Sequence, residues 1–300
     1  LSLSYQIDKP FLSRLQLKKP IMKIRKAVIP AAGFGTRFLP QTKAMPKEML
    51  PIVDKPVIQY VVEEAVASGI KDIIIVTGWH KRSIEDHFDY PYELIKLLEQ
   101  QKKEKLLEEV KRTASLANFI YIRQKGPYGN GTPVLSARPV VGEEPFVVLW
   151  GDEFIYSTPP RTRQCIEVFE KYGDPVISAI RVSKEDVSRY GIVEAKNIEG
   201  NIWQIQRLIE KPSIEEAPST LAAHGCYVLT PDIFPFLENA KPGKSDEIWL
   251  TDAIQELMKT RPVYACEIKD GKYYDTGNKL EYLKTVIEFA LAHKDINGEF

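Results

Sequence analysis

The sequence lacks several features that would point to common classes of protein. It has three cysteines, Cys165, Cys226 and Cys266, and none of them belongs to a Cys-x-x-Cys pair. An odd number of widely spaced cysteines excludes the usual zinc motifs and is typical of reduced thiols, so we expect a cytoplasmic protein. No apolar run approaches the ~18 residues that a membrane-spanning helix requires. We therefore expect no association with a membrane.

An excess of charge of either sign is also absent. Lysine and arginine total 41, aspartate and glutamate total 41, and the formal net charge is zero. A chain without an overall positive field is not predicted to bind nucleic acid. Any phosphate site must therefore arise from cations placed locally. The four histidines form no group with metal-ligand spacing, and we assign none of them a catalytic role.

Glycines and cations do come together near the N-terminus. Residues 27–37 are Ala-Val-Ile-Pro-Ala-Ala-Gly-Phe-Gly-Thr-Arg, and residues 46–51 are Pro-Lys-Glu-Met-Leu-Pro. Glycines allow backbone N–H groups to approach an anion closely, and the nearby arginine and lysine can neutralise its charge. The segment therefore predicts a site for a nucleoside triphosphate.

The spacing of this loop excludes two other glycine motifs. The phosphate loop of ATPases requires G-x-x-x-x-G-K-[ST], whereas this chain has G-x-G-T-R. A dinucleotide-binding turn requires G-x-G-x-x-G and a helix directly after it. Here Phe38 stands at the third glycine position, and the prolines that follow prevent one long helix. An NAD-dependent oxidoreductase is therefore a distant alternative.

The segment Gly33-x-Gly-Thr-Arg37 followed by Pro46-Lys-Glu-Met-Leu-Pro-Ile-Val-Asp-Lys-Pro56 resembles the sugar-1-phosphate nucleotidylyltransferases. Within that family it is most similar to the bacterial-type UTP–glucose-1-phosphate uridylyltransferases, over roughly residues 24–293. The resemblance implies the nucleotide-diphospho-sugar transferase fold and a Mg²⁺ cofactor. It also implies UTP and glucose 1-phosphate as substrates, and a homodimer or homotetramer.

The order of predicted elements agrees with this fold. Strands and helices alternate, which indicates an α/β protein with a Rossmann-like mixed, mostly parallel sheet flanked by helices. Strands are predicted at Lys26–Pro30, Asp72–Thr77, Asn118–Arg123, Pro145–Trp150, Pro175–Val182, Gly191–Lys196, Asn201–Leu208, Ala222–Leu229 and Pro262–Ile268. Helices are predicted at Val57–Ser68, Glu93–Arg112 and Ser245–Lys259.

We expect residues 22–300 to form a single domain. Its nucleotide half would cover about 22–160 and its sugar half about 161–278, followed by a C-terminal helix at 279–293. Residues 1–21 precede the first predicted strand and show no regular pattern. We expect them to be a disordered extension or a segment that is foreign to the native protein.

The resemblance assigns roles to residues that follow the first predicted strand. The backbone of Ala32 and Gly33 would meet uracil, Arg37 would reach the β- and γ-phosphates, and Lys47 matches the catalytic lysine. Glu48 aligns with a glutamate near the base.

A second segment is expected at the base. Gln124 offers a donor and an acceptor together, as the recognition of uracil requires, and Gly129 would allow close approach of the backbone. The segment Gly129-Asn-Gly-Thr-Pro133 departs from the family's usual G-L-G-H-A. This departure leaves the preference among nucleobases open.

Two aspartates and a second set of residues complete the expected site. Asp152 and Asp275 each follow a predicted strand beside a glycine and match the family's metal positions, which suits the oxygen ligands that Mg²⁺ prefers. Gly191 would lie against the hexose, Glu210 would accept hydrogen bonds from its hydroxyls, and Lys211 would hold its phosphate. The segment 246–252 resembles D-E-I-Q-L-T-D with Trp249 in place of glutamine, and we leave it out of the site.

Alternatives to the UTP and glucose reaction remain open at this stage. Gln124 cannot separate uracil from thymine, because the two bases share the same pairing edge, so dTTP or another hexose 1-phosphate is possible. A catalytically silent regulatory subunit that binds nucleotide sugars is a further alternative. Such a protein is expected to have lost Lys47, Asp152 or Asp275, and this chain keeps all three.

Overall fold

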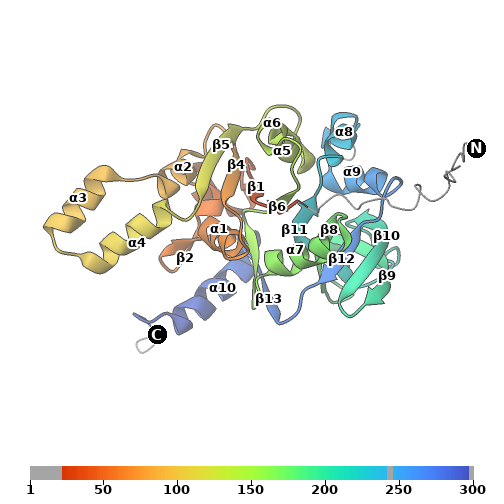
Figure 1. Cartoon of the computed structure of the whole chain (residues 1–300). Helices are drawn as coiled ribbons and strands as arrows, with labels where there is room; N and C mark the ends of the chain where they lie inside the picture. The colour runs from red at the N-terminus through yellow and green to blue at the C-terminus, as the bar shows by residue number, and fades with distance from the viewer. Residues whose placement is uncertain (1–21, 242–245, 297–300) are drawn as a thin grey trace, which may run out of the picture.

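The fold is described by a computed structural model of residues 22–241 and 246–296. The expected extension at residues 1–21 lies outside these ranges. One nine-stranded sheet runs through the molecule, with helices on both faces (Figure 1). Its strands lie in the order β5-β4-β1-β6-β11-β8-β12-β10-β9. The predicted mixed α/β fold is confirmed.

The bounds of the elements follow the apolar runs closely in the first half of the chain. The large sheet contains β1 (Lys26–Ala31), β4 (Asp72–Thr77), β5 (Asn118–Arg123), β6 (Phe146–Leu149), β8 (Val176–Arg181), β9 (Gly191–Glu199), β10 (Ile202–Glu210), β11 (Leu221–Leu229) and β12 (Tyr264–Glu267). Two small sheets pair β2 (Pro51–Ile52) with β3 (Lys55–Pro56) and β7 (Glu153–Ser157) with β13 (Gly271–Asp275). The helices are α1 (Val57–Ala67), α2 (Arg82–Phe88), α3 (Tyr92–Gln100), α4 (Glu104–Ala114), α5 (Gly131–Ser136), α6 (Arg138–Val141), α7 (Arg161–Tyr172), α8 (Ile233–Glu238), α9 (Leu250–Leu257) and α10 (Lys279–Ala292). None of these described helices is long and apolar enough to cross a membrane.

The central strands are apolar throughout because both of their faces are covered. In β1, Ala27 and Ile29 belong to a core that also contains residues of α1 and α7, whereas Val28 belongs to a core with residues of α5, α8 and α9. A strand between two layers of helices has no solvent-facing side, so it needs no alternation of polar and apolar residues. The sequence pattern predicted this arrangement for Asp72–Thr77.

Parallel pairing is concentrated where the glycine loop begins. Strands β5, β4, β1 and β6 run in the same direction, and β8 and β12 form a further parallel pair. Their other neighbours in the sheet pair antiparallel. After β1 the chain moves first to β4 on one side and later to β6 on the other. Such a switch point opens a crevice at the carboxyl ends of the strands, where ligands bind in open α/β sheets.

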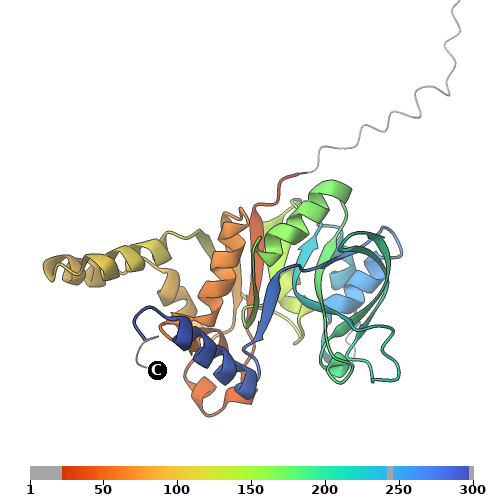
Figure 2. The same ribbon diagram turned by 90° about the horizontal axis from the view of Figure 1, so that it is seen from below.

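The single helix predicted for Glu93–Arg112 is wrong. The chain forms two antiparallel helices, α3 and α4, which project from the body as a hairpin (Figures 1 and 2). Between them Lys102 adopts a left-handed φ of 53°, and Lys111 Nζ donates to Glu99 Oε1 at 3.0 Å across the hairpin. Residues 99–105 at the turn are all glutamate, glutamine or lysine, which favour a helix, so local propensity gave no sign of the reversal.

The helix predicted for Ser245–Lys259 also begins too early, and its first residue lies outside the described ranges. The structure starts α9 at Leu250, because the preceding segment pairs with another loop instead of coiling. Ile248 donates its N–H to the carbonyl of Tyr128 at 3.0 Å and accepts from the N–H of Gly131 at 2.9 Å. A contact between residues so distant in sequence cannot be seen in a local pattern.

The loop at residues 128–131 is shaped by this contact. Gly129 has a φ of 123°, and a Cβ at this position would lie 2.2 Å from the carbonyl oxygen of Ile248. The side-chain oxygen Oδ1 of Asn130 accepts a hydrogen bond from the N–H of Leu250 at 2.7 Å and so caps the start of α9. Gly129 therefore permits the close approach of another backbone segment, at Ile248. The sequence had predicted the close approach of a ligand instead.

This geometry predicts a large loss of stability for Gly129→Ala. Gly200 provides the control, since it also has a positive φ of 51° but open space around its Cβ position. Gly200→Ala should cost about 1 kcal/mol of unfolding free energy through backbone strain alone. Gly129→Ala adds a backbone clash and should cost at least about 3 kcal/mol. Urea unfolding followed by circular dichroism measures both, and equal losses would contradict the predicted clash.

Candidate active site

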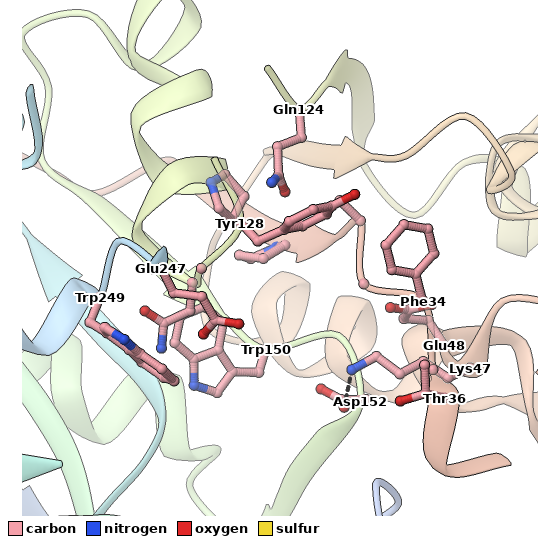
Figure 3. A pocket seen from close by; sticks show the side chains of 17 residues that line it. Phe34, Thr36, Lys47, Glu48, Gln124, Tyr128, Trp150, Asp152, Glu247 and Trp249 are labelled. Atoms are coloured by element: carbon pink, nitrogen blue, oxygen red, sulfur yellow. Dashed lines mark hydrogen bonds and ion pairs between the residues drawn. The ribbon is translucent and has the colours of Figure 1, made fainter. Parts of the chain in front are cut away.

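Two of the cavities at the carboxyl ends of the parallel strands hold most of the predicted site residues. The first, which we call the loop cavity, has a volume of about 630 Å³ (Figure 3). It is lined by Pro30, Ala32, Gly33, Phe34, Gly35, Thr36, Lys47, Glu48, Gln124, Tyr128, Gly129, Asn130, Pro133, Trp150, Asp152, Glu247 and Trp249. All of the residues that the sequence assigned to the nucleotide line it except Arg37.

The second, which we call the carboxylate cavity, has a volume of about 510 Å³. Its lining consists of Arg37, Asp152, Glu153, Ser188, Arg189, Tyr190, Lys211, Tyr273, Asp275, Gly277 and Asn278. Asp152 lines both cavities, so they meet at this residue. The two predicted metal ligands and the predicted phosphate ligand Lys211 thus share one chamber, although Asp152 follows β6, Lys211 follows β10 and Asp275 ends β13.

An ion pair joins the glycine loop to the end of β6 at this junction. Lys47 Nζ lies 2.5 Å from Asp152 Oδ2, and both side chains are about three-quarters buried. Burial disfavours the ammonium, but the carboxylates of Asp152 and Glu48 outweigh it and raise the pKa of Lys47. Burial likewise opposes ionisation of Asp152, yet Lys47 and Arg37 lower the pKa of this carboxyl below its ordinary value. Both groups are charged at neutral pH.

The glycines of the site leave room beside these charges. A Cβ on Gly33 would stand 3.9 Å from Lys47 Nζ, so the missing side chain keeps the space over the ammonium open. A Cβ on Gly277 would stand 3.2 Å from Asp275 Oδ1, 3.5 Å from Asp152 Oδ2 and 3.6 Å from Arg37 Nη1. Gly277 therefore marks a point that both carboxylates and one guanidinium face.

The two aspartates fit Mg²⁺ in donor type. Each offers a hard oxygen toward the same point, and Mg²⁺ typically takes one or two carboxylates and completes its shell with substrate phosphates and water. Within residues 22–241 and 246–296, no group of three or more His, Cys, Asp or Glu is arranged to hold a metal. A metal at this point would therefore complete its shell with water or with oxygens from a phosphate ligand.

Asp275 is paired with a cation that the sequence did not single out. Arg189 Nη2 donates to Asp275 Oδ2 at 2.7 Å, and its Nη1 donates to Asp186 Oδ1 at 3.0 Å. Arg189 precedes the Tyr190-Gly191 turn, and this position was the one available signal. The carboxylate cavity is thus lined by Arg37, Arg189 and Lys211 as well as by its acidic residues.

Glu48 lies beside Lys47 and forms a second, deeper ion pair. Lys81 Nζ donates to Glu48 Oε2 at 2.7 Å, and the two side chains are 0% and 1% exposed. Burial lowers the pKa of Lys81 and raises that of Glu48, although each partner opposes the shift in the other. Glu48 Oε1 is buried and has no hydrogen-bond partner among the described residues. Nothing in the sequence around Lys81 indicated that a lysine is buried there.

The predicted sugar residues lie together at the β9–β10 pair. Gly191 pairs with Glu210 in register, and a Cβ on Gly191 would stand 3.2 Å from Glu210 Oε2. Neither residue lines the loop cavity or the carboxylate cavity. Lys211, the next residue, does line the carboxylate cavity. Burial raises the pKa of Glu210 despite the nearby ammonium of Lys211.

Aromatic side chains complete the loop cavity and were not predicted. Figure 3 shows Trp249 and Lys47 on opposite sides of the cavity, with Trp150 between them. Phe34 stacks on His80 with ring centroids 5.4 Å apart, and Tyr128 approaches Phe34 at 5.7 Å. The sequence showed Trp249 only as a departure from a family motif.

A family profile described as nucleotidyl transferase matches residues 26–290. This chain belongs to the nucleotidyl transferase family. Two curated family members named UTP–glucose-1-phosphate uridylyltransferase are similar over most of the chain. The protein of Bacillus subtilis (strain 168) is 51% identical over 277 residues, covering 92% of this chain and 94% of the relative. That of Staphylococcus haemolyticus (strain JCSC1435) is 50% identical over 277 residues, covering 92% and 96%.

Solved structures of family members superpose well. A UDP-glucose pyrophosphorylase complexed with UDP-glucose gives a TM-score of 0.82 at 41% identity and covers 89% of this chain and 98% of its own. A UTP-bound UGPase from Acinetobacter baumannii gives 0.85 at 40% identity and covers 93% and 97%. The fold and the family expected from the glycine loop are confirmed.

The neighbour of Asp152 provides a test of the electrostatics. Burial raises the pKa of Glu153 to about 7, against the opposing charge of Arg161, while Tyr273 donates its hydroxyl to Glu153 Oε2 at 2.9 Å. Because the folded-state pKa is raised, the stability that protonated Glu153 contributes is present below its unfolded pKa and is lost as pH rises through about 7.

Glu153→Gln should therefore gain melting temperature relative to wild type as pH rises from 5 to 8. The corresponding gain in unfolding free energy is at most about 3 kcal/mol, since each unit of pKa shift corresponds to about 1.4 kcal/mol. Exposed Glu143, replaced in the same way, controls for the general loss of one carboxylate. A melting-temperature difference that stays constant across this pH range would contradict the shift.

Proposed function

We propose that this protein is a UTP–glucose-1-phosphate uridylyltransferase, which converts UTP and α-D-glucose 1-phosphate into UDP-glucose and pyrophosphate. The proposal is supported by relatives of that name that are half identical over 92% of the chain. It is also supported by solved neighbours that are described as bound to UTP or complexed with UDP-glucose. These lines favour UTP over dTTP and an active enzyme over a silent subunit.

One observation supports the chemistry most directly. The cations of the glycine loop and the two aspartates meet at the junction of two cavities, each large enough to hold part of a nucleotide sugar. The loop cavity has Gln124 and the backbone of Ala32 and Gly33 for a base. The carboxylate cavity has Lys211 for a second phosphate. A reaction between two phosphates would then take place beside Lys47 and Asp152.

The reaction needs no nucleophile or general base from the protein. An ionised oxygen of glucose 1-phosphate attacks the α-phosphorus of UTP in line, and the bond from that phosphorus to the bridging oxygen breaks as pyrophosphate leaves. Catalysis then consists of positioning and of charge stabilisation. Lys47 is a compact cation that can move from Asp152 to the leaving pyrophosphate, and Arg37 offers a planar fork to the β- and γ-phosphates.

Further residues would bind the sugar and the metal. Glu210 would accept hydrogen bonds from the hexose hydroxyls where Gly191 leaves space beside it, and Lys211 would bind the sugar phosphate. Asp152 and Asp275 would hold Mg²⁺, which when bound neutralises charge at the α-phosphate. Arg189 would compete with a metal for Asp275, because it occupies one of its oxygens.

We also propose that the enzyme acts as a homo-oligomer in the cytoplasm. Four apolar residues of α10 are 47–59% exposed and recur every three or four positions, which forms one apolar stripe: Leu280, Leu283, Ile287 and Leu291. The resemblance of the chain to the sugar-1-phosphate nucleotidylyltransferases favours a dimer or tetramer. The three free, buried cysteines suit a reducing compartment.

The first test is pyrophosphate release with Mg²⁺ and glucose 1-phosphate, run in parallel with UTP, dTTP, ATP, GTP and CTP. We expect a strong preference for UTP. Lys47→Ala should lower turnover on the order of 10²-fold or more while the melting temperature shows an intact fold. Lys71→Ala removes an exposed lysine at the opposite end of the strands and should leave turnover unchanged. Preference for dTTP, or no release from folded protein with any triphosphate, would overturn the proposal.

The metal assignment has its own test. Asp275→Asn should raise the Mg²⁺ concentration needed for half-maximal turnover about tenfold, because one charged ligand is lost. Asp270→Asn is the matched control, since Asp270 is exposed, lies outside the carboxylate cavity and has a φ of 50° that asparagine tolerates. An unchanged Mg²⁺ dependence in Asp275→Asn would remove this residue from the metal site.

A further inference from the structure

Lys211 is held in place in an unusual manner for a cation of the carboxylate cavity. It has a left-handed φ of 46°, and its N–H donates to the carbonyl of Tyr190 at 3.0 Å, so the direction of its side chain is set by the backbone. Its ammonium lies 5.2 Å from the centroid of the Trp249 ring. Among the described residues, the carboxylate oxygen within 4 Å of it is Glu210 Oε1, at 3.9 Å.

Two other cations of the site are paired directly with carboxylates. Lys47 lies 2.5 Å from Asp152, and Arg189 lies 2.7 Å from Asp275. A carboxylate partner cancels charge and occupies N–H donors, so it competes with an incoming phosphate. An aromatic face attracts a cation through its quadrupole and leaves both the full charge and the N–H donors available. Lys211 therefore keeps its binding capacity while it is held in position.

The backbone on both sides of Trp249 is itself fixed. The residue before it, Ile248, makes two backbone hydrogen bonds to the 128–131 loop, and the residue after it is capped by Asn130. Trp249 lines the loop cavity, whereas Lys211 lines the carboxylate cavity, so their contact crosses the wall between the two. The two cavities are thus joined a second time, at a distance from the Lys47–Asp152 pair.

We propose that Trp249 is a positioning residue, whose indole face holds the ammonium of Lys211 ready for the phosphate of the sugar phosphate; this rests on the proposed function. The segment around Trp249 resembles a family motif with glutamine at this position. A glutamine amide offers no aromatic face, so this chain positions its phosphate lysine by a contact that the motif does not encode. The indole acts through Lys211 and has no direct role in the chemistry.

The test separates the two substrates. Trp249→Leu should raise the KM for glucose 1-phosphate about tenfold, while the KM for UTP and kcat stay within about twofold. Trp249→Phe keeps an aromatic face and should stay within about threefold of wild type for both substrates. In Lys211→Ala, the further change of Trp249 to leucine should have no added effect, because the residue it positions is gone.

Several results would overturn the proposal. These are effects of the two changes that multiply in the double variant, an equal rise in both KM values, and a phenylalanine variant as impaired as the leucine variant. Each of these results would mean that Trp249 acts only as part of the lining of the loop cavity or only in packing. Melting temperatures of all variants control for folding.

A spectroscopic measurement keeps the test valid if Trp249→Leu does not fold. In protein labelled with 5-fluorotryptophan, the ¹⁹F resonance of Trp249 is identified by its absence from Trp249→Phe. Without any ligand, this resonance should shift in Lys211→Ala as the cation leaves the ring, and an unshifted resonance would contradict the contact. Glucose 1-phosphate should move the resonance in wild type and not in Lys211→Ala. A wild type that turns over no sugar phosphate would overturn the proposed function, while the ligand-free comparison would still decide the contact.

Discussion

The geometry of the site depends on the ion pair between Lys47 and Asp152. The two residues are 105 positions apart, and their contact ties the glycine loop after β1 to the end of β6. It stands at the switch point of the sheet, where the loop cavity and the carboxylate cavity meet at Asp152. Opposite charges that are largely removed from water must stay together, because either one alone would lose most of its solvation. The two cavities are consequently held in contact at a single charged point.

Without a ligand, the cations of the site are balanced by its aspartates, and they can bind a phosphate when one enters. Lys47 forms an ion pair with Asp152, and Arg189 forms one with Asp275. The ammonium of Lys211 instead contacts the indole of Trp249. A substrate that carries negative charge can take over these cations, and a divalent metal can take over the carboxylates. The protein thus keeps a dense set of charges ordered without requiring any of them to be buried alone.

The sequence was most informative where chemistry and secondary structure coincide locally. Apolar runs such as Asp72–Thr77 indicated the parallel strands, and the glycines with Lys47 indicated the loop cavity. It failed at one local turn and where distant segments meet. The break between α3 and α4 depends on the left-handed Lys102, and the late start of α9 depends on the pairing of Ile248 with the 128–131 loop. Arg189 and Lys81 were missed for the same reason, since only the folded chain shows which carboxylate each of them meets.

The buried pair of Glu48 and Lys81 restricts how this protein can change over evolution. Both side chains are almost fully hidden, so replacing either one leaves an unpaired charge inside the molecule. Breaking such a pair costs about 3–5 kcal/mol, a large share of the roughly 5–15 kcal/mol that stabilises an ordinary domain. A lineage could exchange the pair for apolar residues only through an intermediate near the limit of stability. Glu48 and Lys81 should therefore be inherited together, as one character at two positions.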